Sequence, residues 1–423
     1  MMKTKYLIPM LLLLSAGAAA QTSKQEIYKD PNRSGGYYYP YPGPVQKALT
    51  PAPAGYEPFY ISHHGRHGSR FMTDNAYYEI AIQKLDTAAQ LGILTPKGAQ
   101  VLETLRKGYA DAWKRDGELS ALGGRQHQEI ARRMYERFPE LLSQPMQVDA
   151  RSSVIGRCLV SMFYFCEQLQ GMNPALDIRM AASQRDMRFV IGNSKVKIEE
   201  SPAQEEMEER VSAMLEKAAN PDRLMKTLFT DVPRAKTFVD GYEFIEALFN
   251  IASDLPNIPE SGLSLTDLFT KEEKYGIWKG SNAGLMLALG LIPGSTPAYE
   301  MQREARDSIV SMADQVIRSG KPALTLRFGH DSSLVPLAYL MGLKEATGGT
   351  SDFDKLNKSL SMDKLVPMAA NIQLVFYRKE GSDDVLVKFL LNENETSIPV
   401  KTDVAPYYHW KDVKDYWASY PIK

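Results

Sequence analysis

The stretch "SHHGRHGSR", residues 62–70, gathers three of the six histidines of this 423-residue chain together with two arginines. It follows "PFYIS", residues 58–62, a short apolar run that predicts a buried strand. It contains Gly65 and Gly68, and a helical pattern begins after it at about Asp74. The order of strand, glycine-containing loop and helix favours anion binding, because loop and helix N–H groups point outward and glycine lets a ligand approach the backbone.

Three kinds of chemistry compete for this stretch. Arg66 and Arg70 bracket His67. Guanidinium groups match phosphate oxygens two at a time, and a histidine between two of them is placed to attack a bound phosphorus atom. A metal site on His63 and His67 is the second interpretation, but their i, i+4 spacing serves a metal only on a helix, which the two glycines disfavour. The third is a solvated basic loop. We favour phosphate chemistry and expect neither a metal nor another cofactor.

Strand and helix patterns alternate on both sides of a helical middle, which predicts an α/β fold. We expect a central mixed, mainly parallel sheet flanked by helices, with an inserted helical cap domain. The expected helices cover 74–91, 96–113, 122–138 and a segment around Cys158, and the expected strands cover 58–62, 146–150, 322–331 and a hairpin of 371–379 and 384–392. The expected domains are an irregular arm over 21–58, an α/β catalytic core over 59–168 and 295–423, and the helical cap over 169–294.

The first twenty residues carry a targeting pattern. Lys3 and Lys5 precede "YLIPMLLLLSAGAAA", an apolar run that ends in small residues, and this predicts a signal peptide over residues 1–20. We therefore expect a secreted protein, periplasmic or extracellular. No later stretch reaches the ~18 consecutive apolar residues of a membrane span. The balance of 50 basic and 51 acidic residues argues against a general nucleic-acid or membrane surface.

The two cysteines, Cys158 and Cys166, lie eight positions apart in the expected helix "RCLVSMFYFCEQLQ". Eight residues of helix span ~12 Å, whereas a disulfide needs Cα atoms within ~7 Å. We therefore expect two free and largely buried thiols.

Four stretches together resemble one protein family. "RHGSR" (66–70) resembles the Arg-His-Gly-x-Arg signature of the histidine phosphatase superfamily. "GELSALGGRQHQEI" (117–130) is similar to the Gly-x-Leu-Thr-x-x-Gly-x-x-Gln-His segment of its acid-phosphatase branch, and "GHDSSLVPL" (329–337) is similar to that branch's distal His-Asp motif. "ARSSVIGRCLVS" (150–161) aligns with the segment that supplies a third active-site arginine. The four stretches stand in family order.

Two details point to different members of that family. The pair Arg157-Cys158 resembles the multiple inositol polyphosphate phosphatases, which usually carry His-Ala-Glu as their distal motif. This chain instead has His330-Asp331-Ser332, as in acid phosphatases and His-Asp phytases. After the last arginine of the first motif, the branch usually has any one residue and then a proline, whereas in this chain Arg70 is followed by Phe71 and Met72.

The resemblance implies a secreted histidine-type phosphomonoesterase that works through a phosphohistidine intermediate on a small sugar or inositol phosphate. It implies His67 as nucleophile and Asp331 as proton donor, although Asp331 could also be a helix cap. It implies phosphate binding by Arg66, Arg70, Arg157 and His330, with Arg151 as a rival for the role of Arg157. Basic residues of the helical middle are candidates for substrate specificity: Arg185, Lys195, Lys197, Lys274 and Lys279.

Three other functions stay open at this point. The first is a phytase or multiple inositol polyphosphate phosphatase acting mainly on inositol hexakisphosphate. The second, from outside the enzymes, is an inactive binder of phosphorylated ligands, although both His67 and Asp331 are present. The third is a transferase of the phosphoglycerate mutase type, which the signal peptide and the His-Asp motif disfavour.

Overall fold

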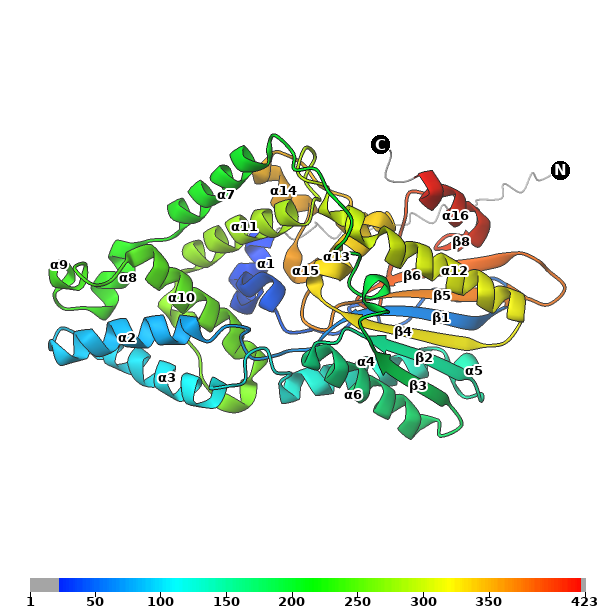
Figure 1. Ribbon diagram of the computed structural model, residues 1–423, viewed down its shortest axis with the longest axis horizontal. Helices are drawn as coiled ribbons and strands as arrows, with labels where there is room; N and C mark the ends of the chain where they lie inside the picture. The colour runs from blue at the N-terminus through cyan, green and yellow to red at the C-terminus, as the bar shows by residue number, and fades with distance from the viewer. Residues whose placement is uncertain (1–22, 420–423) are drawn as a thin grey trace, which may run out of the picture.

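The computed structural model describes residues 23–419 and consists of a mixed eight-stranded sheet flanked by helices, with a helical region at one end (Figure 1). The strand order is β3-β2-β4-β1-β5-β6-β7, and β8 pairs with β6. The signal peptide expected over residues 1–20 lies outside the described residues. Within residues 23–419, no helix combines the length and the apolar character that a membrane crossing requires.

Four strands of the sheet are parallel, and three of them, β2, β4 and β1, lead into sequence motifs. The four strands are β3 (Asp177–Ala182), β2 (Gln147–Ser152), β4 (Ala323–Gly329) and β1 (Tyr56–Arg66). β1 is buried from Phe59 to Arg66, as expected of a strand covered on both faces of its sheet. The carboxyl ends of parallel strands lie at one edge, which is where such sheets bind ligands.

The other half of the sheet is antiparallel. β5 (Asn371–Lys379) pairs with β1 and forms a hairpin with β6 (Val385–Leu391), which in turn pairs with β7 (Asn394–Thr396) and β8 (Tyr407–His409). The prediction of a mixed α/β sheet with this hairpin is confirmed. Parallel pairing is confined to β3, β2, β4 and β1, so the sheet has three parallel and four antiparallel pairings where a mainly parallel sheet was expected.

The helices around the first motifs begin and end within two residues of their predicted limits. They are α2 (Ala76–Gln90), α3 (Pro96–Ala112) and α4 (Ala121–Arg137). Thr95 and Ser120 cap α3 and α4 by accepting hydrogen bonds from the backbone N–H groups of Gly98 and Gly123.

The other helices of the sheet domain are α5 (Pro139–Leu142), α6 (Gly156–Met172), α12 (Arg303–Ser319), α13 (Asp331–Leu340), α14 (Phe353–Ser359), α15 (Met362–Leu365) and α16 (Trp410–Ser419). Cys158 and Cys166 on α6 are buried and free, as predicted.

The helical region differs from the predicted cap over 169–294 in two ways. β3 falls inside that range but is the edge strand of the main sheet. The helices α2 and α3, predicted as part of the core, pack with α8 (Pro221–Leu228) and α10 (Gly241–Asp254) around one apolar cluster (Figure 1). The helical region, with α7 (Gln204–Ala218), α9 (Val232–Ala235) and α11 (Lys271–Ala288), is thus built from two chain segments. Apolar periodicity predicts which face of a helix is buried, but not which partner buries it.

The arm expected to be irregular over 21–58 is partly regular. It contains α1 (Ser23–Lys29) and a 3₁₀ segment, η1 (Pro31–Tyr38), which begins at an Asp30 cap, and its last three residues belong to β1. η1 contacts α10, α11 and α15, so the arm lies between the helical region and the sheet. Tyr38 and Tyr39 are buried there.

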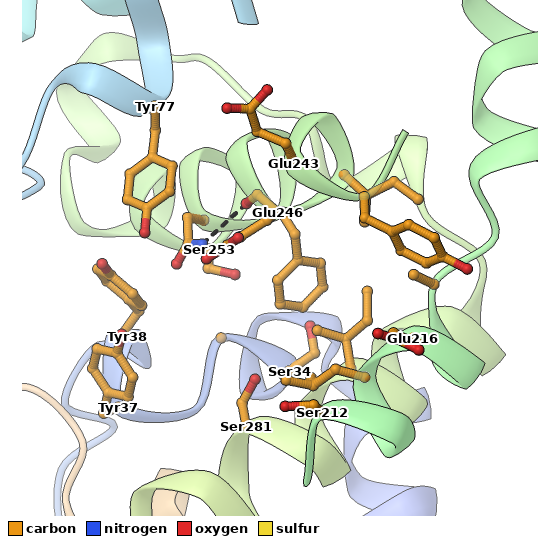
Figure 2. Close-up of a pocket in the computed structure, with 18 of the residues that line it drawn as sticks. Ser34, Tyr37, Tyr38, Tyr77, Ser212, Glu216, Glu243, Glu246, Ser253 and Ser281 are labelled. Carbon is orange, nitrogen blue, oxygen red and sulfur yellow. Dashed lines mark hydrogen bonds between the residues drawn. The ribbon is translucent and has the colours of Figure 1, made fainter. Parts of the chain in front are cut away.

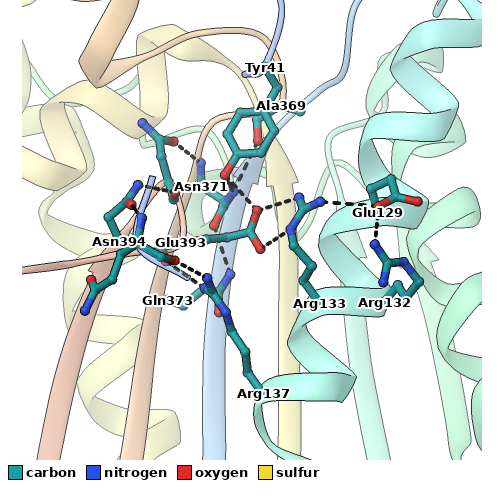
Figure 3. A network of polar contacts seen from close by, with 12 residues as sticks. Tyr41, Glu129, Arg132, Arg133, Arg137, Ala369, Asn371, Gln373, Glu393 and Asn394 are labelled. Carbon is teal, nitrogen blue, oxygen red and sulfur yellow. Dashed lines mark hydrogen bonds and ion pairs between the residues drawn. The ribbon is translucent and has the colours of Figure 1, made fainter. Parts of the chain in front are cut away.

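One buried polar network, which we call the Glu393 network, joins α4 to the turn between β6 and β7 (Figure 3). The carboxylate of Glu393 accepts hydrogen bonds from Arg133 Nε (2.9 Å) and Nη2 (2.7 Å), and from the hydroxyl of Tyr41 (2.8 Å). Arg137 donates to the carbonyl oxygens of Glu393 (2.7 Å) and Gln46 (2.8 Å). The network therefore ties helix, hairpin and arm together.

Candidate active site

The four sequence motifs meet at the carboxyl edge of β2, β4 and β1. His67 directly follows β1, His330 and Asp331 follow β4, and Arg157 lies in the first turn of α6, which follows β2. The imidazole rings of His67 and His330 lie 5.6 Å apart, centroid to centroid. Because these strands are neighbours in the sheet, residues up to 264 positions apart in sequence lie at one edge of it.

The loop after β1 is fixed by close contact with the start of α4. A Cβ atom on Gly68 would lie 2.5 Å from the carbonyl oxygen of Gly123, so only glycine permits this approach. The backbone N–H of Gly68 donates to Ser161 Oγ (3.1 Å), and that of Ser69 donates to Gln126 Oε1 (2.8 Å). The segment 117–130 thus supports the loop.

His67 is held in the form that a nucleophile requires. Its Nδ1 lies 2.9 Å from the carbonyl oxygen of Gly68. A carbonyl oxygen only accepts, so Nδ1 carries the proton and Nε2 carries the free lone pair. Burial, followed by the charges of Arg66, Arg70 and Arg157, keeps the pKa of His67 well below its ordinary value. The ring is therefore neutral and available to attack an electrophile.

Arg66 is completely buried and rigidly oriented. Its Nη1 donates to the carbonyl oxygens of Tyr37 (2.6 Å) and Val366 (2.7 Å), and its Nη2 lies 3.1 Å from Asp331 Oδ2. Nε has no hydrogen-bond partner within the described residues. The guanidinium therefore keeps one donor free while the backbone fixes its plane.

Arg70 and Arg157 complete a cluster of three arginines. Arg70 donates from Nη1 to the carbonyl oxygen of Phe71 (2.8 Å), and its guanidinium lies 5.0 Å from the ring centroid of Tyr38. Arg157 Nη2 lies 3.4 Å from His330 Nδ1. The Nε atoms of both arginines lack a partner among residues 23–419. Buried donors without partners are rare in folded proteins, and here three arginines that have them surround His67, which is the composition of an anion site.

His330 and Asp331 lie at the start of α13. Because Arg157 only donates, His330 Nδ1 accepts and Nε2 carries the proton, 3.2 Å from Ser153 Oγ. Burial and then the charge of Arg157 lower the pKa of His330 to about 4, so the ring is neutral at neutral pH. His330 is the cap residue of α13, and Asp331 is its first residue.

Asp331 is a carboxylate in the ligand-free protein. Burial alone would raise its pKa, but the charge of Arg66 and the hydrogen bond from the Ser332 N–H (2.9 Å) hold the pKa below its ordinary value. The protonated form that proton donation requires is therefore expected only when a bound anion occupies the arginines.

All six residues singled out for phosphate chemistry lie together, but the rival Arg151 does not join them. Arg151 is paired with Asp149 (2.7 Å) and Asp186 (3.4 Å) instead. His63, the other half of the metal interpretation, packs against the rings of Phe165 and Phe328. No group of three His, Cys, Asp or Glu side chains suited to a metal occurs in residues 23–419.

The specificity candidates are scattered. Lys279 pairs with Asp354, and Arg185 pairs with Asp186. Lys274 is buried on α11, whereas Lys195 and Lys197 are exposed in the segment that leads from β3 to α7. Val190 in this segment lies against Gly329, next to His330.

A cavity of about 790 Å³ lies behind the arm, between it and the helical region (Figure 2). Tyr37 and Tyr38, which contact Arg66 and Arg70, form one wall together with Tyr77. The lining also includes four acidic residues, Glu216, Asp240, Glu243 and Glu246. Its described lining contains no Lys, Arg or His. The space lined by Tyr37 and Tyr38 is therefore acidic.

Sequence reasoning missed the residues that contact the arginines and His330 from distant parts of the chain. Tyr37 and Tyr38 were visible only as part of a tyrosine-rich arm. Ser153, beside His330, and Asp254, 3.7 Å from Arg70, carry no local signal. Both follow from tertiary packing of elements far apart in sequence.

Comparisons with known proteins agree with this geometry. Residues 65–392 match the model of the histidine phosphatase superfamily (branch 2). Multiple inositol polyphosphate phosphatase 1 of Gallus gallus is 24% identical over 400 residues, covering 86% of this chain and 84% of that protein.

Solved structures share the fold. A Bifidobacterium longum multiple inositol polyphosphate phosphatase, in complex with inositol hexasulfate, superposes with a TM-score of 0.76 at 18% identity, covering 92% of this chain and 98% of that one. The phytase from D. castellii gives a TM-score of 0.66 at 15% identity, covering 92% and 85%.

Proposed function

Because the chain belongs to branch 2 of the histidine phosphatase superfamily and is therefore a phosphatase, we propose that it hydrolyses phosphate monoesters through a phosphohistidine on His67. The observation that carries this proposal is the free lone pair of His67 Nε2, beside three arginines that each keep Nε unpaired. Phosphoryl transfer is catalysed mainly by positioning and by neutralising charge, and both are provided here.

In the first step, Nε2 of His67 attacks phosphorus and forms the N–P bond. The bond from phosphorus to the ester oxygen breaks, and its electron pair goes to the leaving oxygen. Asp331 gives that oxygen its proton, because a sugar or inositol alkoxide is a poor leaving group. Arg66, Arg70, Arg157 and His330 bind the phosphoryl oxygens.

In the second step, water attacks the phosphohistidine and gives a proton to the carboxylate of Asp331. The N–P bond breaks, its electron pair returns to Nε2, and phosphate leaves. Because Asp331 must begin the cycle protonated, we expect an acid or mildly acid optimum. The bound phosphate supports this state, since its negative charge offsets Arg66 and raises the pKa of Asp331.

The proposed substrates are small phosphate monoesters such as sugar or inositol phosphates. Activity on inositol hexakisphosphate is the second candidate, favoured by likeness to the Gallus gallus and Bifidobacterium longum phosphatases and by the exposed Lys195 and Lys197 in the segment whose Val190 lies against Gly329. The acidic cavity beside Tyr37 and Tyr38 disfavours additional phosphates on that side. We also propose export of the protein, supported by the signal pattern of residues 1–20.

The experiment compares phosphate release from inositol hexakisphosphate, glucose phosphate and p-nitrophenyl phosphate at one pH. His67→Ala should abolish turnover of all three, whereas the control His409→Ala, which changes a histidine on β8, should not. Acid-free rapid quench should trap phosphohistidine on the wild-type chain.

Treatment with EDTA should leave activity unchanged, because arginines supply the positive charge. Loss of activity that zinc restores would revive the metal interpretation. Phosphate binding without turnover of any ester would establish an inactive binder instead.

A further inference from the structure

A buried carboxyl group lies directly behind the phosphate-binding arginines. Asp254, the last residue of α10, is 1% exposed, and its Oδ1 lies 3.7 Å from Arg70 Nη1. That oxygen has no hydrogen-bond partner within the described chain. A buried carboxylate with neither a close ion pair nor full hydrogen bonding is costly, so its presence beside a ligand-binding group calls for a role.

Few other groups face this carboxyl. From the loop after β1, the backbone N–H of Met72 bonds to it, and from α2 the buried phenol of Tyr78 is close enough to interact electrostatically. On the far side of Arg70 stand the ring of Tyr38 and, across the site, the carboxylate of Asp331. Asp254 is therefore the carboxylate that approaches Arg70 from the helical region.

We infer that Asp254 is a positioning residue of the phosphate site, which holds Arg70 from the helical region and competes with bound phosphate for the same guanidinium. This inference rests on the proposed function, since it assumes that Arg70 binds the phosphoryl group. Arg70 Nη1 already donates to Phe71, so Asp254 constrains the group without taking up its donors.

The competition depends on whether Asp254 is ionised. Burial raises the pKa of Asp254 to about 7, against the opposing effect of Arg70. Below neutral pH the group is uncharged and leaves the charge of Arg70 to the phosphate. Above neutral pH it is a carboxylate, and a phosphate anion on the other side of Arg70 must bind against its repulsion or with uptake of one proton.

The test measures binding of inorganic phosphate by calorimetry between pH 6 and pH 9 for the wild type and Asp254→Asn. Asparagine keeps the shape of the side chain but cannot ionise. Phosphate itself also ionises over this pH range, but it does so equally in both titrations. The ratio of the two affinities at each pH therefore reports only the difference between the two proteins. The matched control is Asp231→Asn, at the exposed cap of α9, which should behave as the wild type.

The two proteins should bind phosphate equally at pH 6. The wild type should become weaker than Asp254→Asn by up to about tenfold at pH 8, the limit for one coupled proton. In turnover of p-nitrophenyl phosphate the same ratio should appear in KM and not in kcat. Identical pH profiles of the two proteins, in binding and in KM, would overturn the inference while leaving the proposed function intact.

Binding and turnover separate the two proposals. If the wild type binds phosphate with the Asp254-dependent profile but turns over no ester, the proposed function fails and the positioning role stands. Should Asp254→Asn not fold, wild-type calorimetry in buffers of different ionisation heat decides. The same measurement on Asp331→Asn removes the proton that bound phosphate places on Asp331, so uptake that persists at pH 8 in this variant, beyond that of phosphate itself, is assigned to Asp254, and its absence overturns the inference.

Discussion

The arginines of the candidate active site and those of the Glu393 network are bonded in opposite ways. Arg133 meets both oxygens of a carboxylate that is 1% exposed, and Arg137 donates to two backbone carbonyls. In contrast, Arg66, Arg70 and Arg157 each keep Nε without a partner. An arginine whose donors are all met by protein stabilises the fold, whereas one with unmet donors is prepared for an anion.

Asp331→Asn should give the largest effect, because it removes the proton donor and leaves the arginines in place. On a sugar or inositol phosphate, kcat should fall by about 10² to 10⁴-fold, the usual contribution of a general acid. On p-nitrophenyl phosphate, whose leaving group needs little help, the loss should be clearly smaller. Steady-state kinetics on the two esters measures this, and equal losses would mean that Asp331 only starts α13.

Arg157→Ala should separate activity from stability. Removing one donor to the phosphoryl group should lower kcat/KM by about 10² to 10³-fold. Since no carboxylate within residues 23–419 forms an ion pair with Arg157, the free energy of unfolding should change by only about 0.5 kcal/mol. Kinetics and urea unfolding test both parts, with Arg151→Ala as the control whose activity stays near that of the wild type.

Arg133→Ala should show the reverse pattern. It leaves the buried carboxylate of Glu393 unpaired, which should destabilise the fold by roughly 3 kcal/mol, the low end for a broken buried pair because Arg133 is partly exposed. The folded fraction should keep its kcat. Arg132→Ala on the same helix breaks only exposed pairs with Glu129 and Glu136 and should cost below about 1 kcal/mol. Equal destabilisation by both changes would remove the distinction between the two kinds of arginine.

His409→Gln should give the smallest effect, and one that depends on pH. Hydrogen bonds to Asp384 and Asp403 raise the pKa of His409. The stabilisation by the protonated ring is therefore complete below its ordinary pKa and is lost as pH rises through the higher folded value. The site is partly exposed, so the effect should be small. In urea unfolding, the free energy of unfolding of the wild type should exceed that of the variant by about 1 kcal/mol or less at pH 5, and the difference should shrink at pH 9. A difference that does not change with pH would contradict this.

Local pattern predicted the parts of the site that lie next to the strands. Arg66, His67 and Arg70 follow from one loop, whereas the roles of His330 and Asp331, at the end of another strand, came from the family resemblance. Arg157 was preferred over Arg151 only on the family resemblance, and the structure gives the physical reason: Arg157 lies on α6 beside His330, whereas Arg151 is paired with Asp149 and Asp186.

The parts that could not be predicted depend on long-range packing. The sequence showed that α2 and α3 have buried faces, but their partners, α8 and α10, lie more than 100 residues away. Asp254 meets Arg70 only because α10 packs on that cluster and ends beside the loop after β1. Tyr37 was one aromatic residue among several, and its carbonyl oxygen, which binds Arg66, belongs to the backbone and leaves no trace in composition.

The two carbonyl partners of Arg66 stand 29 and 300 positions away along the chain. Contacts of such sequence separation form late, because the entropy of closing the long loop opposes them until most of the native structure is present. A nascent or partly unfolded chain therefore has an RHGSR segment but no oriented guanidinium and no pocket for phosphate. Recovery of activity after denaturation should follow the slowest phase of refolding, so that catalysis reports on the completed molecule.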